Sequence, residues 1–195
     1  ARPVAVADAA FIAHSVLEAL SAAHRRASGP VFHRDVTPAN ILVSRTGEVK
    51  LTDFGLARAM DRMTVTLPGV VVGKLAYVAP ELIAAERATA ASDIYSLGIV
   101  LWEMLAGRRL FQAHNELELF MMAGRAVIPN LDELRDDVPN ELAEVVRQMT
   151  RKQPAQRLAS AHEAAELVGA FVTGDRRDAL GHWVAEAHTA TAPKR

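Results

Sequence analysis

The sequence predicts a mainly α-helical protein that carries one small β-hairpin. Two observations favour this fold class. Long stretches repeat apolar residues at helical spacing, whereas only two short segments, residues 40–44 and 48–54, resemble strands. Two such strands cannot enclose a core, and the alternation of strands and helices typical of a parallel sheet does not appear. The apolar half of the 195 residues is therefore expected to be buried mainly between helices.

The expected elements follow one another in a simple order. Residues 4–27 have apolar side chains at helical spacing, and Gly29 and Pro30 end this helix. A hairpin follows, because the segments ILVS and VKLT flank a turn that contains Gly47. Residues 57–73 show no periodic pattern. Further helices are expected over residues 80–86, 93–106, 114–124, 140–151, 160–172 and 176–188.

The composition narrows the class of partner and the compartment. The formal net charge is −1, from 22 basic and 23 acidic residues, so we expect no nucleic-acid or anionic-membrane partner for the surface as a whole. The chain has no cysteine, which fits a reducing cytoplasm. No signal peptide is expected at the start of the sequence. The longest apolar run, residues 94–106, is too short to span a bilayer.

Three polar residues lie near the ends of the predicted hairpin. Asp35 comes just before it, Asn40 begins it and Asp53 follows it. Because a hairpin brings its outer ends together, Asn40 and Asp53 should be neighbours. An amide oxygen beside a carboxylate suits Mg²⁺ that also holds phosphate oxygens. Asp35 could accept a proton from an incoming hydroxyl, so these residues together suggest phosphoryl transfer.

These residues resemble those of a known family, the eukaryotic-like (bacterial-type) serine/threonine protein kinases. Five motifs stand in family order and at family spacing over roughly residues 3–173. They are HRDVTPAN (33–40) in the catalytic loop, DFG (53–55) at the metal site, VAPE (78–81) at the end of the activation segment, SDIYSLGIVLWEMLAG (92–107) in the central buried helix, and Arg157 in PAQRLAS. The resemblance implies the C-terminal lobe of a kinase domain.

The resemblance also implies roles for individual residues. Asp35 would be the catalytic base, while Asn40 and Asp53 would hold the Mg²⁺ that accompanies ATP. Further implied roles are a phosphate-receiving Arg34, a floor of the ATP pocket made by Ile41, Leu42 and Val43, a hydrophobic column containing His33 and Phe54, an Asp93 that accepts backbone hydrogen bonds from the catalytic loop, and a buried ion pair of Glu81 with Arg157.

One pair of residues departs from the family pattern. Serine/threonine kinases usually have lysine two residues after the catalytic aspartate, where this chain has Thr37. They usually have threonine after the glycine that precedes the Ala-Pro-Glu region, where this chain has Lys74. In the family the two side chains converge beside the aspartate. We expect an exchange in which Lys74 supplies the cation that meets the γ-phosphate and Thr37 the hydroxyl that steadies Asp35.

The resemblance divides the chain into regions. Residues 1–175 would form the lobe, with the catalytic loop at 32–42 and the activation segment at 53–81, and residues 176–195 would form a terminal helix and tail. Thr66 or Thr64 is the expected phosphorylation site. Phosphothreonine would give Arg34 charge-assisted hydrogen bonds.

No Gly-x-Gly-x-x-Gly loop and no Val-Ala-x-Lys strand occur in the sequence. We therefore expect a C-terminal lobe whose N-terminal lobe is absent, and which by itself does not phosphorylate protein substrates. The rival function is a non-catalytic binding module, as in pseudokinases. Apolar residues 41–43 and Phe54 would be left exposed without the other lobe, so a homodimer through this surface is also expected, with activation segments exchanged between the copies.

Overall fold

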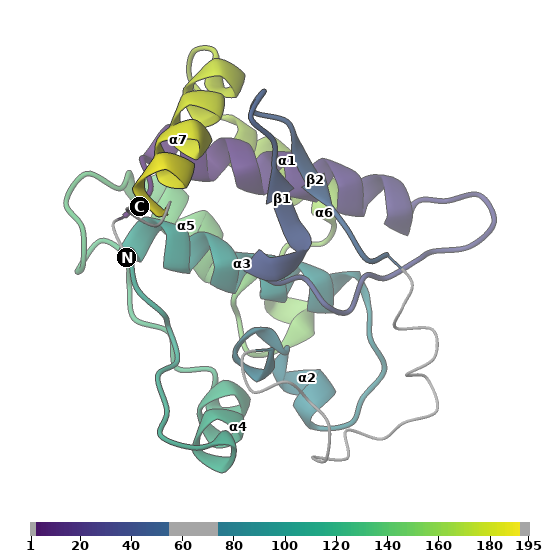
Figure 1. The fold of residues 1–195 in the computed structure, drawn as a ribbon. Coiled ribbons are helices and arrows are strands. Elements are labelled where there is room, and N and C mark those ends of the chain that lie inside the picture. Colours follow the sequence, from purple (N-terminus) through teal and green to yellow (C-terminus); the bar gives the residue numbers. More distant parts are fainter. Residues whose placement is uncertain (1–2, 55–73, 192–195) are drawn as a thin grey trace.

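The computed structural model describes residues 3–54 and 74–191, with side chains up to residue 186. This part of the chain forms helices, short 3₁₀ turns and a two-stranded sheet (Figure 1). In order, the elements are α1 (Val6–His24), η1 (Pro38–Asn40), β1 (Ile41–Val43), β2 (Val49–Leu51), η3 (Leu75–Tyr77), α2 (Pro80–Ile83), α3 (Ala90–Ala106), α4 (Glu116–Arg125), α5 (Asn140–Met149), η4 (Pro154–Gln156), α6 (Ala161–Gly169) and α7 (Arg176–Thr191).

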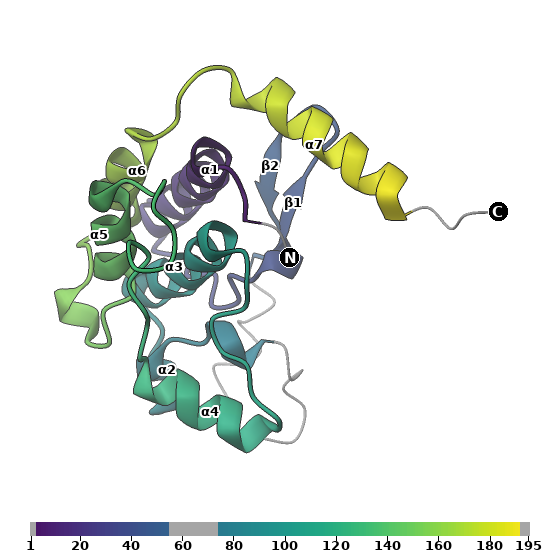
Figure 2. The ribbon, with the colours of Figure 1, turned by 90° about the vertical axis from the view of Figure 1, so that its left-hand side faces the viewer.

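The helices α1 and α3 form the centre of the molecule. α1 packs against α3 and α6, and α3 also packs against α5. In Figure 2, α5 and α6 lie on one side of this central pair and the hairpin lies on the other. α4 packs against α2 and η3 below them. One continuous apolar core joins these elements, and its largest fully buried side chains include Trp102, Tyr95, Leu17, Leu20 and Leu97.

The helix α3 is buried on all sides along residues 92–102, which is the pattern of a helix at the centre of a core. Gly98 allows α5 to approach it closely. A Cβ atom at Gly98 would lie 2.7 Å from the Thr150 side chain and 3.0 Å from that of Met149. Any larger residue would push α5 away, so this glycine fixes the distance between the two helices.

The hairpin is short and antiparallel. Its strands pair with Ile41 opposite Leu51, and the backbone N–H of Ser44 donates to the carbonyl of Glu48 at 2.8 Å to close the turn. α7 packs against this turn. A Cβ atom at Gly47 would lie 1.9 Å from the carbonyl oxygen of Arg177, so no other residue fits there. The hairpin is thus held between α1 on one side and α7 at its tip.

The structure confirms the predicted mainly helical fold class with a small hairpin. Each helix has at least one boundary that differs from the sequence prediction by a few residues, and two of these differences have clear local reasons. α2 ends at Ile83 because Ala85 adopts a left-handed φ of 61° and the Glu86 N–H returns to the Glu81 carbonyl at 2.9 Å. α3 begins earlier than predicted, at Ala90, where the Ser92 hydroxyl accepts from the backbone of Thr89 at 3.2 Å.

Among the described residues, α1 is the one helix long and apolar enough to cross a membrane by length and composition. Core helices of soluble proteins pass the same test. Since α1 packs against α3 and α6 and buries eight of its residues, its apolar composition is explained by its place in the core.

Candidate active site

The loop that carries His33 and Arg34 is held by one buried carboxylate. Asp93, at the start of α3, accepts the backbone N–H of His33 at 2.8 Å and that of Arg34 at 2.7 Å. Arg34 has a φ of 69°, a conformation that costs free energy for a residue with a side chain. The two hydrogen bonds to a charged acceptor stabilise this strained turn.

His33 connects the same loop to the end of the hairpin. Its Nε2 lies 2.7 Å from the carbonyl oxygen of Thr52, and because a carbonyl only accepts, Nε2 carries the proton. Its Nδ1 can then accept the N–H of Asp35 at 3.3 Å. The Phe54 ring meets the His33 ring edge-on, with 4.6 Å between centroids. His33, which is fully buried, therefore ties Asp35 and Phe54 to one point of the fold.

Asp35, Asn40 and Lys74 converge although they come from two distant parts of the chain. The amide Nδ2 of Asn40 donates to the Asp35 backbone carbonyl at 2.7 Å and to its Oδ2 at 2.9 Å. The Lys74 ammonium donates to the same Oδ2. The two charged side chains are partly open to solvent, at 30% exposed for Asp35 and 43% for Lys74. A carboxylate held in this way has a fixed direction but stays accessible.

Thr37 lies beside these residues without joining them. Its hydroxyl is buried and has no hydrogen-bond partner in the described part of the chain. The sequence hypothesis gave Thr37 the task of steadying Asp35, whereas in the structure the Asn40 amide makes that contact. The 3₁₀ turn η1 that Pro38 begins carries Asn40 back over Asp35, which explains why the amide reaches the carboxylate.

The hairpin brings Asn40 close to the segment that leads into Asp53. The N–H of Thr52 donates to the Asn40 carbonyl at 2.9 Å. Asp53 follows with a left-handed φ of 63° and an exposed side chain. The Asp53 carboxylate and the amide oxygen of Asn40 are hard-oxygen donors of the kind that Mg²⁺ accepts. No cluster of three or more metal-binding side chains occurs among the described residues, so an ion at this place would also need oxygens from a phosphate.

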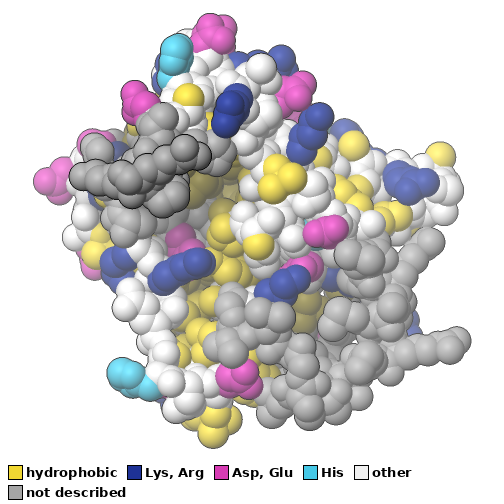
Figure 3. All heavy atoms as spheres, in the orientation of Figure 1, with side chains coloured by type: hydrophobic (Ala, Val, Ile, Leu, Met, Phe, Trp, Pro, Cys, Tyr) yellow, Lys and Arg dark blue, Asp and Glu magenta, His cyan; other side chains and the backbone are white. Residues whose placement is uncertain are grey.

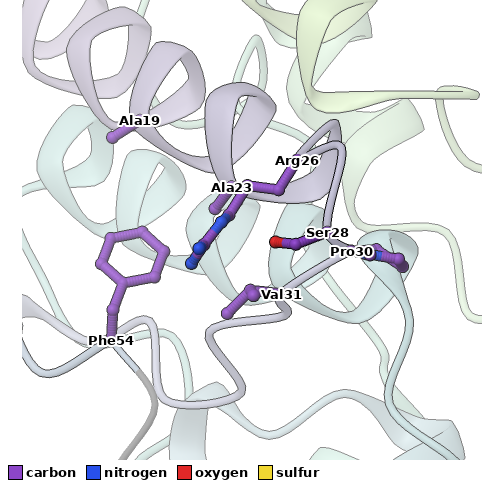
Figure 4. A pocket seen from close by; sticks show the side chains of 8 residues that line it. Ala19, Ala23, Arg26, Ser28, Pro30, Val31 and Phe54 are labelled. Carbon is purple, nitrogen blue, oxygen red and sulfur yellow. The ribbon is translucent and has the colours of Figure 1, made fainter.

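The surface around the hairpin is partly apolar. Ile41 packs against the core, while Leu42 is 53% exposed and Phe54 37% exposed. Figure 3 shows hydrophobic side chains gathered around the hairpin on this face. A pocket of about 570 Å³ lies between Phe54 and the end of α1, with Ala19, Ala23, Arg26, Ser28, Gly29, Pro30 and Val31 as its other lining residues (Figure 4).

Glu81 and Arg157 form a buried ion pair behind the site. Two guanidinium N–H groups donate to the two carboxylate oxygens, both at 2.7 Å, and the side chains are 4% and 0% exposed. Arg157 also donates to backbone carbonyls of Ala91, Arg151 and Lys152. Burial acts to raise the pKa of Glu81, but hydrogen bonds and charge from Arg157 outweigh it and hold that pKa below its ordinary value.

Sequence reasoning missed two residues that matter in this region. His24 donates from Nε2 to the Oδ2 of Asp93 at 2.8 Å, so it helps to fix the carboxylate that holds the loop of His33 and Arg34. Glu103 accepts from Tyr77, and burial raises its pKa although a backbone hydrogen bond from Leu110 opposes that shift. A charged residue inside an apolar helix was the available signal for Glu103.

The predicted phosphorylation sites Thr64 and Thr66 lie outside the described residues.

The fold and these contacts define a class of protein. A helical lobe with a hairpin presents an aspartate, an asparagine and a lysine to one another, and a second aspartate follows the hairpin. The family model described as "Protein kinase domain" matches residues 2–168, which is most of the chain. The chain therefore belongs to the protein kinase family.

Several bacterial proteins resemble the chain closely. Serine/threonine-protein kinase PknL of Mycobacterium tuberculosis is 40% identical over 75% of this chain, and PknA of the same species is 41% identical over 81%. The probable serine/threonine-protein kinase PknB of Lactococcus lactis is 34% identical over 90%. These alignments cover 36%, 35% and 27% of the relatives. The chain thus spans about a third of the length of the curated relatives that it matches.

Proposed function

We propose that this chain is the C-terminal lobe of a serine/threonine protein kinase that transfers the γ-phosphoryl group of MgATP to protein substrates. The observation that carries the proposal is the way Asp35 is held. Asn40 and Lys74 both bond to its Oδ2, and within the described part of the chain no hydrogen bond reaches its Oδ1. That oxygen is free to accept the proton of an incoming hydroxyl, which is the task of a general base.

The other residues of the site support the same reaction. Lys74 places a cation beside the base, where it can meet phosphate oxygens as they approach. Asn40 and Asp53 would hold Mg²⁺, which when bound neutralises phosphate charge. Ile41, Leu42 and Val43 would form the apolar floor beneath the adenine ring. The family and the names of the relatives support serine/threonine specificity and a protein substrate, and ATP is the phosphate donor that the family resemblance implies.

Activation of this kinase is proposed to involve Thr66 or Thr64. Arg34 lies directly before the base and is held in a fixed backbone conformation by Asp93, so a phosphothreonine bound to it would order the segment next to the site. Mass spectrometry of the active protein decides between phosphorylation and an unmodified segment. Full activity after both threonines are changed to alanine would contradict the proposal.

The cytoplasmic location and the swapped homodimer stay predictions.

The proposal is tested by phosphate transfer in a longer protein, made by joining this chain to the N-terminal lobe of a kinase. Asp35→Asn is expected to abolish transfer of radiolabel from ATP to a protein substrate. Lys74→Ala is expected to lower kcat/KM at least about tenfold, or ~1.4 kcal/mol of barrier, because it removes the cation beside the base. Lys50→Ala, on an exposed lysine of the hairpin, is the matched control and should change the rate little.

The alternative function, a non-catalytic binding module, predicts the opposite result. A non-catalytic lobe that only binds partners would show no transfer that depends on Asp35, even in the longer protein. The 195-residue chain alone should also be inactive, since phosphoryl transfer relies on positioning of the phosphates and its sequence contains no Gly-x-Gly-x-x-Gly loop. Robust Asp35-dependent turnover by the chain alone would show that this lobe positions ATP by itself.

A further inference from the structure

The position of the Lys74 ammonium depends on the backbone that follows it. Lys74 is the N-terminal cap of the 3₁₀ turn η3, and its carbonyl accepts the N–H of Tyr77 at 3.1 Å. Leu75 and Ala76 are buried against the core. In a kinase whose lysine belongs to the catalytic loop, that loop alone would set the distance to the base. Here Lys74 and Asp35 lie on separate segments, so the position of one segment relative to the other must be fixed for Lys74 to reach Asp35.

One polar contact fixes η3 to the central helix. The hydroxyl of Tyr77 donates to the Oε2 of Glu103 on α3 at 2.8 Å, and Tyr77 is only 3% exposed. The Oε1 of Glu103 accepts the backbone N–H of Leu110 at 2.9 Å, and Arg109 donates to Oε2 at 3.2 Å. Glu103 is therefore oriented by three donors, and its carboxylate gives Tyr77 a rigid, charged acceptor.

We infer that Tyr77 and Glu103 are positioning residues that hold Lys74 against Asp35. The inference rests on the proposed function of Lys74. Tyr77 has the one polar side chain in η3, and it lies a single 3₁₀ turn after Lys74. When its hydroxyl is bound to α3, the turn is anchored at its C-terminal end and the lysine projects from its N-terminal end toward the base. Without that anchor, the turn keeps its apolar contacts but loses the directional contact that fixes its orientation.

The second tyrosine of the chain supplies a matched control. The hydroxyl of Tyr95 is buried and has no hydrogen-bond partner among the described residues. Its ring lies 4.7 Å from the guanidinium carbon of Arg157, and phenylalanine would keep that contact. Tyr95→Phe and Tyr77→Phe therefore remove the same atom from two buried rings. Only Tyr77→Phe removes a hydrogen bond that leads to the site.

The test measures the rate at which lysines of the folded chain are acylated by an activated ester, with mass spectrometry as the readout. An amine reacts only after it leaves its carboxylate and loses a proton, so the ion pair slows acylation of Lys74. The exposed Lys50 is the internal reference. Tyr77→Phe is expected to speed acylation of Lys74 relative to Lys50 about fivefold, the factor for a hydrogen bond of ~1 kcal/mol. Tyr95→Phe is expected to leave the ratio unchanged.

Two further variants separate a failure of the positioning inference from a failure of the proposed ion pair. Asp35→Asn should release Lys74 at least as strongly as Tyr77→Phe; if it does not, the ion pair behind the proposed function is wrong. If Asp35→Asn releases Lys74 but Tyr77→Phe matches Tyr95→Phe, the positioning inference is overturned and the ion pair stands. Should Tyr77→Phe unfold, Glu103→Met replaces it, because methionine has a similar size but no oxygen to accept the Tyr77 hydroxyl. An unchanged acylation ratio in folded Glu103→Met would then overturn the inference.

Discussion

The ion pairs Glu81–Arg157 and Asp35–Lys74 differ in how completely the fold encloses them. The first is almost fully buried, forms two parallel hydrogen bonds of 2.7 Å, and has additional partners on its guanidinium and on its carboxylate. The second is 30% and 43% exposed and is joined through one carboxylate oxygen. Each pair connects a residue of the segment that begins at residue 74 to the rest of the helical lobe.

The difference agrees with a division in which the first pair stabilises the fold and the second serves the proposed chemistry. A buried charge without its partner is costly, so the first pair locks α2 to the loop that carries Arg157. An exposed pair contributes little to stability and exchanges its partners readily. The second pair can therefore open, which the proposed entry of a phosphate or a hydroxyl requires. Three changes can break or sharpen this comparison.

The largest effect is expected from Arg157→Ala. It leaves the Glu81 carboxylate buried without its main donor, and should lower the free energy of unfolding by roughly 3–5 kcal/mol. Urea unfolding followed by circular dichroism measures this loss. Arg157→Lys is the control that keeps a cation but only one point of contact, so its loss should be smaller. A loss below about 1 kcal/mol for Arg157→Ala would mean that this pair contributes as little to stability as the exposed Asp35–Lys74 pair.

The second effect is the pH dependence of the same variant. Because the pKa of Glu81 is lowered in the fold, its contribution is complete above the ordinary value of 4.5 and is lost as pH falls through the folded value. The difference in stability between wild type and Arg157→Ala should therefore narrow in acid. Unfolding curves at several pH values below 6 test this. A gap of constant size would show that the charge of Glu81 is not what Arg157 stabilises.

The smallest effect is expected from Asp35→Asn. Since the pair is half-exposed, the free energy of unfolding should change by less than about 1 kcal/mol, even though phosphate transfer by the longer protein is abolished. The same urea experiment measures it. A loss comparable to that of Arg157→Ala would mean that Asp35 is a structural residue and would weaken its assignment as a base.

The sequence by itself determined the fold class and the chemical types in the site. Apolar periodicity is a local property, so it predicts α3 and the other helices to within a few residues. The hairpin follows from two short apolar runs around a turn with Gly47, and its antiparallel pairing makes Asn40 and Asp53 neighbours without reference to the rest of the chain. The resemblance to the protein kinase family also implied the pair of Glu81 with Arg157, although 76 positions separate them.

Tertiary structure decided which atoms bond within that frame. It assigned the contact with Asp35 to Asn40, and left the Thr37 hydroxyl without a partner among the described residues. It alone brought His24 to Asp93, 69 positions away, and Tyr77 to Glu103. Such contacts depend on how helices pack and on backbone conformations that only packing can stabilise. A single chain read locally shows which groups are available, whereas the distance and direction between them are set by the core.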